Sequence, residues 1–345
     1  MKNIYLNFGR FMGQEALPIR SVLPDCELLE SLGIEGEWFR EETKQEFEEH
    51  PEPWCLQRLI TPRSHLQIVR RCPELRAITL SARLDLDAET SIAPITTCGN
   101  LQELHFSGVN GFRVNNFREV LPQVQSLTAL TIEHVTQEHF ARLDVLQNAT
   151  SAPRLKVLVL GRIGVAMGGE LLAKENQQLL VNILQAHQGL ETFELKGLSI
   201  NVLSFFTSIE GDQHKAFCPC PQLKKLSLEI HTTSMLESNP ATMNSLWELV
   251  YTQLGRMNQL ETLMLKSSGL KVTVEAGFLL LGKTTKLKSL TLSDPNRPTW
   301  TVSGLKRLLA VAPELRTLDL KPLTPSHRRQ INAWFKAHEK GFLRF

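Results

Sequence analysis

The stretch that decides the fold is Cys220-Pro221-Gln222-Leu223-Lys224-Lys225-Leu226-Ser227-Leu228. Its leucines form the pattern Leu-x-x-Leu-x-Leu, in which Ile or Phe replaces some leucines elsewhere in the chain. The last two apolar residues alternate with polar ones, which is typical of a short strand with one buried face. The pattern recurs nine times at intervals of 26 to 37 residues, beginning at Leu75, Leu101, Leu127, Leu155, Leu190, Leu223, Leu260, Leu287 and Leu315.

The intervals between these strands have room for helices. A strand with one apolar face is buried only when the strand of the next unit stacks beside it, and parallel neighbours need a crossover. Helical spacing of apolar residues predicts long crossover helices over 169–186, 244–257 and 303–311, and shorter ones over 116–125, 138–147 and 202–209. The sequence therefore predicts an α/β solenoid, a horseshoe with a concave parallel β-sheet and convex helices.

The repeat pattern also predicts how the chain is organised. Residues 55–322 form the repeat array, residues 1–54 an N-terminal cap, and residues 323–345 a C-terminal cap. The last of these contains Ile331, Trp334 and Phe335 at helical spacing, which suits a helix that covers the final apolar face of a solenoid. The 57 leucines among 345 residues are thus mostly core.

Several strands follow a corner made of a small residue and a proline. Examples are Cys72-Pro73-Glu74-Leu75, Ala152-Pro153-Arg154-Leu155 and Ala312-Pro313-Glu314-Leu315. Proline disfavours helix at the residue before it, so it ends the crossover and turns the chain into the strand. We expect the small residue to fit into the tight corner.

Two units show a family resemblance. Cys72-Pro73-Glu74-Leu75-Arg76-Ala77-Ile78-Thr79-Leu80 and the corresponding stretch from Cys220 to Leu228 resemble the cysteine-containing leucine-rich repeat of the F-box/leucine-rich-repeat proteins. The irregular repeat length is similar to that of the divergent F-box-type proteins abundant in fungi. The resemblance covers roughly residues 72–320. It implies a leucine-rich-repeat solenoid that recognises substrates for a cullin-RING ubiquitin ligase.

An F-box itself is not evident. Leu23-Pro24-Asp25-Cys26-Glu27-Leu28-Leu29-Glu30-Ser31-Leu32 imitates its opening, but the following Gly33 and Gly36 break the helical pattern. Leu29-x-x-Leu32-x-Ile34 instead fits the repeat template. Two interpretations of residues 1–54 therefore stay open, a leading repeat and a degenerate F-box remnant.

Composition excludes several classes of protein. A net charge of +2 argues against a dominant nucleic-acid surface. No run of about 18 apolar residues predicts a membrane span, and no secretory signal is visible. Six cysteines in this length do not indicate a disulfide scaffold. We expect an intracellular protein, cytoplasmic or nuclear, that is a monomer.

No motif predicts catalysis, a cofactor or a metal. Cys218 and Cys220 are too close for a zinc pair, and no second pair accompanies them. The glycine-rich segment 161–169 lacks the Lys-Ser/Thr ending of a phosphate-binding loop. We therefore expect a protein that is not an enzyme.

The residues between the motif leucines point out of the predicted sheet into its concave side, because side chains alternate along a strand. We predict that they bind a protein partner, either as a substrate receptor that contacts a cullin-RING adaptor or, alternatively, as a ribonuclease-inhibitor-like regulator that occludes an enzyme. The predicted contact residues run from acidic to more basic along the chain and are Glu103, His105, Glu133, Glu194, Lys196, Lys225, Glu229, Met264, Lys266, Asp319 and Lys321.

Overall fold

In the computed structural model the chain forms two compact units, residues 1–160 and 161–345. The structure describes residues 3–7, 29–35, 54–82, 90–108, 114–115, 117–133, 135, 137–161, 170–201, 205, 220–231, 240–267, 280–281, 284–293, 302–321 and 325–337. Within those residues, no helix is long and apolar enough to cross a bilayer.

The first unit is built on a parallel sheet. Its strands pair in the order β1 (Asn3–Asn7), β2 (Ser31–Glu35), β3 (Arg58–Pro62), β4 (Ala77–Ala82), β6 (Glu103–Gly108), β8 (Ala129–Ile132) and β9 (Val157–Gly161). The register aligns the motif positions, so that Leu59 lies opposite Ile78 and Leu104 opposite Leu130. These four side chains are buried. The apolar alternation of the sequence therefore forms a continuous row in the core.

The crossovers of the first unit are short. They are η2 (Arg63–Arg71), η3 (Ala93–Thr97), α3 (Phe117–Val120), η4 (Leu121–Gln123), α4 (Gln137–Phe140), η5 (Ala141–Gln147) and η6 (Ala149–Ser151), where η marks a 3₁₀ helix. A small pair of strands, β5 (Thr90–Ser91) and β7 (Val114–Asn115), accompanies them. The motifs from Leu75 to Leu155 are 26 to 28 residues apart, and the helices between them have three to seven residues each.

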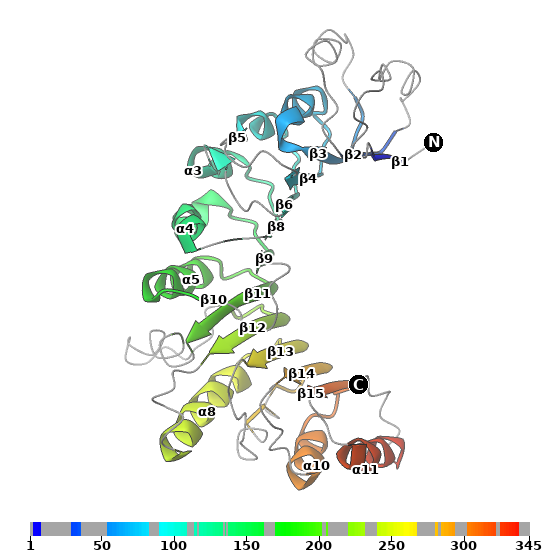
Figure 1. Ribbon diagram of the computed structural model, residues 1–345, viewed down its shortest axis with the longest axis vertical. Helices are drawn as coiled ribbons and strands as arrows, with labels where there is room; N and C mark the ends of the chain where they lie inside the picture. The colour runs from blue at the N-terminus through cyan, green and yellow to red at the C-terminus, as the bar shows by residue number, and fades with distance from the viewer. Residues whose placement is uncertain are drawn as a thin grey trace. The chain divides into compact units, whose positions relative to one another are not determined.

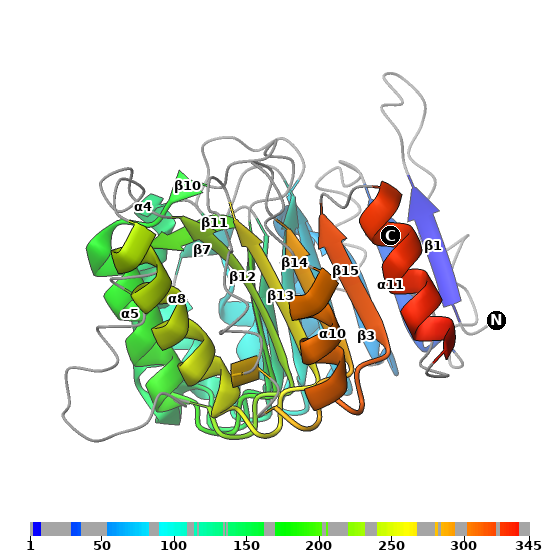
Figure 2. The ribbon, with the colours of Figure 1, turned by 90° about the horizontal axis from the view of Figure 1, so that it is seen from below.

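The second unit repeats the arrangement with longer helices. Parallel strands β11 (Thr192–Asn201), β12 (Lys225–His231), β13 (Thr262–Ser267), β14 (Ser289–Ser293) and β15 (Thr317–Lys321) pair in order, and β10 (Glu170–Leu171) pairs with β11. Helices α5 (Lys174–Ala186), α8 (Pro240–Gly255) and α10 (Val302–Val311) lie on one side of these strands (Figures 1 and 2). Helix α11 (Pro325–Ala337) packs against α10.

A hydrogen-bonded corner starts each motif strand. The carbonyl of the corner residue accepts a hydrogen bond from the amide of the first motif leucine, as in Leu223 N to Cys220 O at 3.0 Å. Nine buried residues occupy this position: Cys72, Cys98, Val124, Ala152, His187, Cys220, Met257, Thr284 and Ala312. Five are small, as expected. Val124, His187, Met257 and Thr284 show that the corner also accepts larger side chains, two of them directly after the long helices α5 and α8.

The structure confirms the predicted α/β leucine-rich-repeat solenoid. The helices predicted over 169–186, 244–257 and 303–311 correspond to α5, α8 and α10, and a helix occupies 325–337. Of the short helix predicted over 202–209, only Phe205 lies within the described residues. The sequence analysis did not assign a strand to residues 3–7, where β1 lies.

Gly33 is explained by a close approach of Tyr5. Strand β2 contains the repeat-like Leu32 and Ile34, both buried, and pairs in parallel with β1 and β3. Gly33 lies opposite Tyr5, and a Cβ placed on Gly33 would lie 2.3 Å from Cδ2 of the Tyr5 ring. A side chain at position 33 would require the exposed Tyr5 ring to move. Of the stretch from Leu23 to Leu32 that imitates an F-box opening, the structure describes residues 29–32, which lead into β2.

The buried faces of the strands predict the cost of truncation. Leu263 on β13 is fully buried, so Leu263→Ala should lower the free energy of unfolding by about 2–5 kcal/mol. Lys266 on the same strand is exposed, and Lys266→Ala should change it by about 0.5 kcal/mol or less. Urea denaturation measures both; equal costs would contradict the strand faces described here.

The corner cysteines should resist alkylation. Burial raises the pKa of Cys72 to about 12, with a smaller contribution from Cys98, and burial raises that of Cys98 to about 11. Cys55, by contrast, is exposed. With iodoacetamide we expect peptide mass spectrometry to find Cys55 modified in the folded chain, and Cys72 and Cys98 modified only after denaturant is added. Rapid modification of all three without denaturant would contradict the buried corners.

Candidate binding surface

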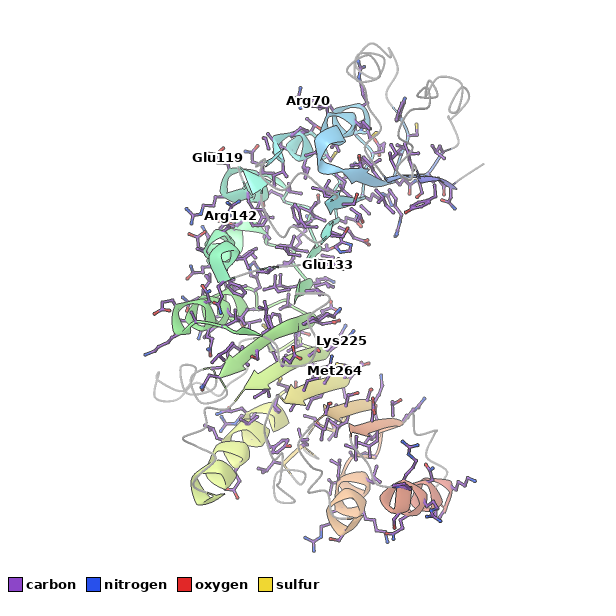
Figure 3. The ribbon with its side chains drawn as sticks, viewed as in Figure 1. Arg70, Glu119, Glu133, Arg142, Lys225 and Met264 are labelled. Carbon is purple, nitrogen blue, oxygen red and sulfur yellow. The ribbon has the colours of Figure 1, made fainter. Side chains whose placement is uncertain are left out.

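Side chains on the strand face away from the helices form regular rows in the second unit. We call this side of β11–β15 the open face; Lys225 and Met264 mark it in Figure 3. Strand pairing places the residues between the motif leucines opposite one another. The first row is Thr192, Lys225, Thr262, Ser289 and Thr317; the second is Glu194, Ser227, Met264, Thr291 and Asp319; the third is Glu229, Lys266, Ser293 and Lys321.

Three of the predicted contact residues form an ionic group. A Glu194 oxygen lies 2.6 Å from Nζ of Lys225 on the next strand, and the other oxygen lies 3.0 Å from Nζ of Lys196. Glu194 is only 8% exposed, whereas both lysine side chains are about half exposed. The carboxylate is therefore held inside the face by two ammonium groups that reach solvent.

The charge state of Glu194 follows from this geometry. Burial by itself would raise the pKa of Glu194, but hydrogen bonds and attraction from Lys225 and Lys196 outweigh it and hold the pKa below the usual value. The carboxylate is thus ionised at neutral pH. Each lysine is fixed by it, which orients two cationic groups on neighbouring strands.

A bulge in β11 lies next to this group. The register between β11 and β12 shifts between Glu194 and Ser199, and Gly197 within this segment has a φ of 64°. That backbone conformation favours glycine, and extra residues in one strand bend it locally. Beyond the bulge, Ile200 returns to the core opposite Ile230.

The remaining predicted residues of this unit lie across β12 to β15. Glu229 and Lys266 are paired in the register, but no ion pair joins them. The Oε2 atom of Glu229 is buried and has no hydrogen-bond partner among the described residues, and Oδ1 of Asp319 is also buried. Met264 is half-buried in the middle of the second row. Lys321 holds the register position opposite Ser293.

The other three predicted contact residues belong to the first unit. His105 Nε2 on β6 lies 3.2 Å from Glu133 Oε1, which follows β8. The two form an ion pair when the imidazole is protonated, although Nε2 makes no hydrogen bond to a described residue. Glu103 is exposed and lies between Ala77 and Ala129 in the register. Glu103 is thus the most exposed of these three residues, since the side chains of His105 and Glu133 are 34% and 23% exposed.

A second charged row, which the sequence analysis missed, runs along the corners of the second unit. Lys224 Nζ lies 2.6 Å from Glu191, and Lys288 Nζ lies 2.9 Å from Glu261. Hydrogen bonding to Glu191 raises the pKa of Lys224, and hydrogen bonding to Lys288 lowers that of Glu261. Each of these residues directly follows the first leucine of its motif, and that constant position is the signal that could have found them.

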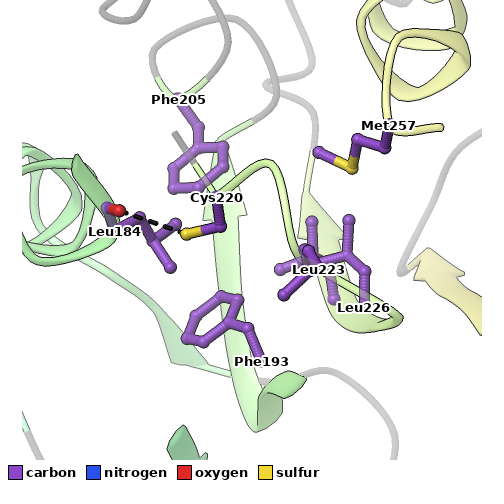
Figure 4. Close-up of a pocket in the computed structure, with 8 residues that line it drawn as sticks. Leu184, Phe193, Phe205, Cys220, Leu223, Leu226 and Met257 are labelled. Atoms are coloured by element: carbon purple, nitrogen blue, oxygen red, sulfur yellow. Dashed lines mark hydrogen bonds between the residues drawn. The ribbon is translucent and has the colours of Figure 1, made fainter. Parts of the chain in front are cut away.

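The described residues offer little for chemistry. They contain no group of three or more His, Cys, Asp and Glu side chains that could hold a metal ion. An apolar cavity of about 10 Å³ lies between α5, β11 and β12, lined by Leu184, Phe193, Phe205, Cys220, Leu226 and Met257 among others (Figure 4). It has room for about one water molecule. Cys218 and residues 162–169 lie outside the described residues.

Comparison with known proteins yields similar structures only. No protein-family model matches the sequence, and no curated protein matches it. The leucine-rich-repeat-containing protein LegL7 from Legionella pneumophila is 12% identical, over 87% of this chain and 95% of that chain, with a TM-score of 0.39. A chain in the yeast Rad7 and Elc1 complex is 13% identical over 77% and 69%, with a TM-score of 0.42.

The mouse RP105/MD-1 complex gives 13% identity over 99% of this chain and 59% of that chain, with a TM-score of 0.43. The leucine-rich-repeat assignment rests on the strand register and corner hydrogen bonds of the chain itself.

Removing one lysine partner of Glu194 should make the effect of pH on the stability of the fold measurable. Lys225→Met leaves a buried carboxylate with one ammonium, so we expect it to lower the free energy of unfolding by about 1–3 kcal/mol near neutral pH. The pKa of Glu194 is lower in the folded chain than its ordinary value of 4.5. The stabilisation that the ionised, paired carboxylate contributes is therefore fully present above pH 4.5, and it is lost as the pH falls through the pKa of the folded chain.

Urea denaturation of the wild type and the variant at about pH 7 and about pH 3 measures the effect. Lys174→Met is the matched control, since Lys174 is exposed at the start of α5. A difference between wild type and Lys225→Met that is unchanged at the lower pH would contradict the role given to Glu194.

Proposed function

We propose that this chain is a non-enzymatic recognition protein that binds another protein through the open face of its leucine-rich-repeat sheet. One observation supports this more than any other: the ionic group of Lys196, Glu194 and Lys225 holds two exposed cations in fixed positions on adjacent strands. Fixed polar groups on a rigid sheet lose little side-chain entropy on binding, which favours specific recognition.

The size of the surface favours a macromolecule over a small ligand. Strands lie about 4.8 Å apart, so β11 to β15 span about 19 Å, which suits one side of a protein interface. The apolar cavity of about 10 Å³ is far smaller than the pockets that hold small molecules. Solenoids commonly bind their partners along such extended surfaces.

A narrower form of the proposal is that the chain acts as a substrate receptor of a cullin-RING ubiquitin ligase. The corners Cys72-Pro73 and Cys220-Pro221 support it, through their resemblance to the cysteine-containing repeats of F-box proteins. In this form a substrate binds the open face, and an adaptor binds elsewhere on the chain.

Site-specific photocrosslinking of the full-length chain in cells tests the proposal. A photoreactive amino acid replaces Met264 or Thr291 on the open face, or, as matched controls, Lys174 on α5 or Lys306 on α10. We expect a discrete crosslinked protein from the two open-face positions and not from the helix positions. Crosslinks of equal yield from both sets would contradict recognition by the open face.

The same crosslinked samples test the ligase version. Capture followed by mass spectrometry should also recover a cullin-RING adaptor. If the open-face crosslink forms and no adaptor is recovered, the ligase role is wrong and recognition by the open face stands.

A further inference from the structure

We propose that the second unit's open face recognises an acidic segment of its protein partner, with side-chain carboxylates or phosphates contacting Lys225 and Lys266. The inference rests on the proposed function and names the chemistry of the partner. It follows from which charged groups of this face are exposed to solvent and which are buried, rather than from the number of charges.

The three lysines of this face whose exposure the structure describes reach solvent, whereas its acidic residues are buried or half-buried. The side chains of Lys196 and Lys225 are 52% and 44% exposed, whereas that of Glu194 is 10% exposed. Lys266 is exposed, but Oε2 of Glu229 and Oδ1 of Asp319 are buried. An approaching partner therefore meets ammonium groups first, even though acidic and basic positions on this face are nearly equal in number.

Lys266 is available to a partner. It makes no hydrogen bond or ion pair with any residue that the structure describes, although Glu229 occupies the paired position on β12. An acidic group that contacts Lys266 does not have to displace a described partner. A charge-assisted hydrogen bond there is also stronger than one between neutral groups.

The neighbouring rows add hydroxyl groups and no aromatic platform. Half-buried hydroxyl side chains occupy the three rows on β13, β14 and β15, namely Thr262, Ser289, Thr291, Ser293 and Thr317. Hydroxyls donate hydrogen bonds to carboxylates and phosphates. Binding of single-stranded nucleic acid typically uses aromatic stacking, and the three rows contain no aromatic residue. A polypeptide is therefore the better match.

Strand register sets a spacing for the acidic groups. Lys225 pairs with Thr262, and Lys266 lies four residues further along β13. At about 3.3 Å per residue, the two lysine positions are about 13 Å apart along the strand direction. An extended peptide with acidic residues four positions apart matches this distance.

The C-terminal part of the second unit carries an excess of positive charge. Segments 284–293, 302–321 and 325–337 contain nine Lys and Arg residues but only Glu314 and Asp319 as acids, although the whole chain has a net charge of +2. Such a local excess of positive charge steers acidic partners.

Fluorescence anisotropy with the full-length chain tests the inference. The probes are labelled peptides of about twelve residues in a Gly/Ser host, with two Glu, two phosphoserine, two Gln or two Lys residues four positions apart. An oligothymidylate of similar length is the nucleic-acid probe. We expect the Glu or phosphoserine peptide to bind at least about tenfold more tightly than the Gln peptide, and less tightly as salt rises.

Lys266→Gln should weaken the acidic peptide about five- to tenfold, with unchanged thermal unfolding, and Lys174→Gln should leave binding unchanged. A difference in affinity between the Glu and phosphoserine peptides would show whether the face prefers carboxylates or phosphates. Equal affinity for the acidic and Gln peptides would overturn the inference. An equal loss of acidic-peptide affinity in Lys266→Gln and Lys174→Gln would overturn it as well. Oligothymidylate binding that exceeds acidic-peptide binding and depends on Lys266 would overturn it in favour of nucleic acid.

The peptide result separates this inference from the proposed function. If acidic peptides show no preference while the open-face photocrosslinks persist, the chemistry assigned to the partner is wrong and recognition stands. If the open-face crosslinks are also absent, the proposed function fails as well.

Discussion

The corner hydrogen bond is the interaction on which the rest of this structure depends. The carbonyl of each buried corner residue accepts from the amide of the first motif leucine, for example Cys72 O from Leu75 N at 3.2 Å. This bond fixes where each strand begins. Because side chains alternate along a strand, a slip of one residue would move the leucines out of the core. The same bond therefore decides which side chains reach the open face.

The corners also link one repeat to the next. The thiol of Cys98 donates to the carbonyl of Cys72, and that of Cys220 donates to the carbonyls of Leu184 and His187. A buried thiol thus adds a second hydrogen bond to the corner carbonyls of the preceding repeat, which already accept from the first motif leucine. Cysteine at this position serves hydrogen bonding and close packing, which explains why it recurs where alanine also fits.

Leucine spacing was enough to predict the motif strands and the three long crossovers, since burial of one strand face imposes a period that the sequence shows directly. It was not enough for β1, whose Ile4 and Leu6 follow no upstream motif leucine, nor for the role of Gly33, which depends on the ring of Tyr5. Nor does it show that Glu194 is buried between Lys196 and Lys225, which depends on the pairing of β11 with β12. Such contacts arise from three-dimensional pairing, which a pattern along one chain does not contain.

The difference in depth between cations and anions has a simple physical origin. A lysine side chain is long and can extend its ammonium beyond the strand surface, whereas glutamate and aspartate are shorter and stay close to the backbone. On a flat sheet with both types in neighbouring rows, the carboxylates lie below and the ammonium groups above. Glu194 with Lys196 and Lys225 shows this arrangement at ion-pair distances. A nearly balanced set of charges on a sheet can therefore present a cationic surface, and counting residues in the sequence does not reveal it.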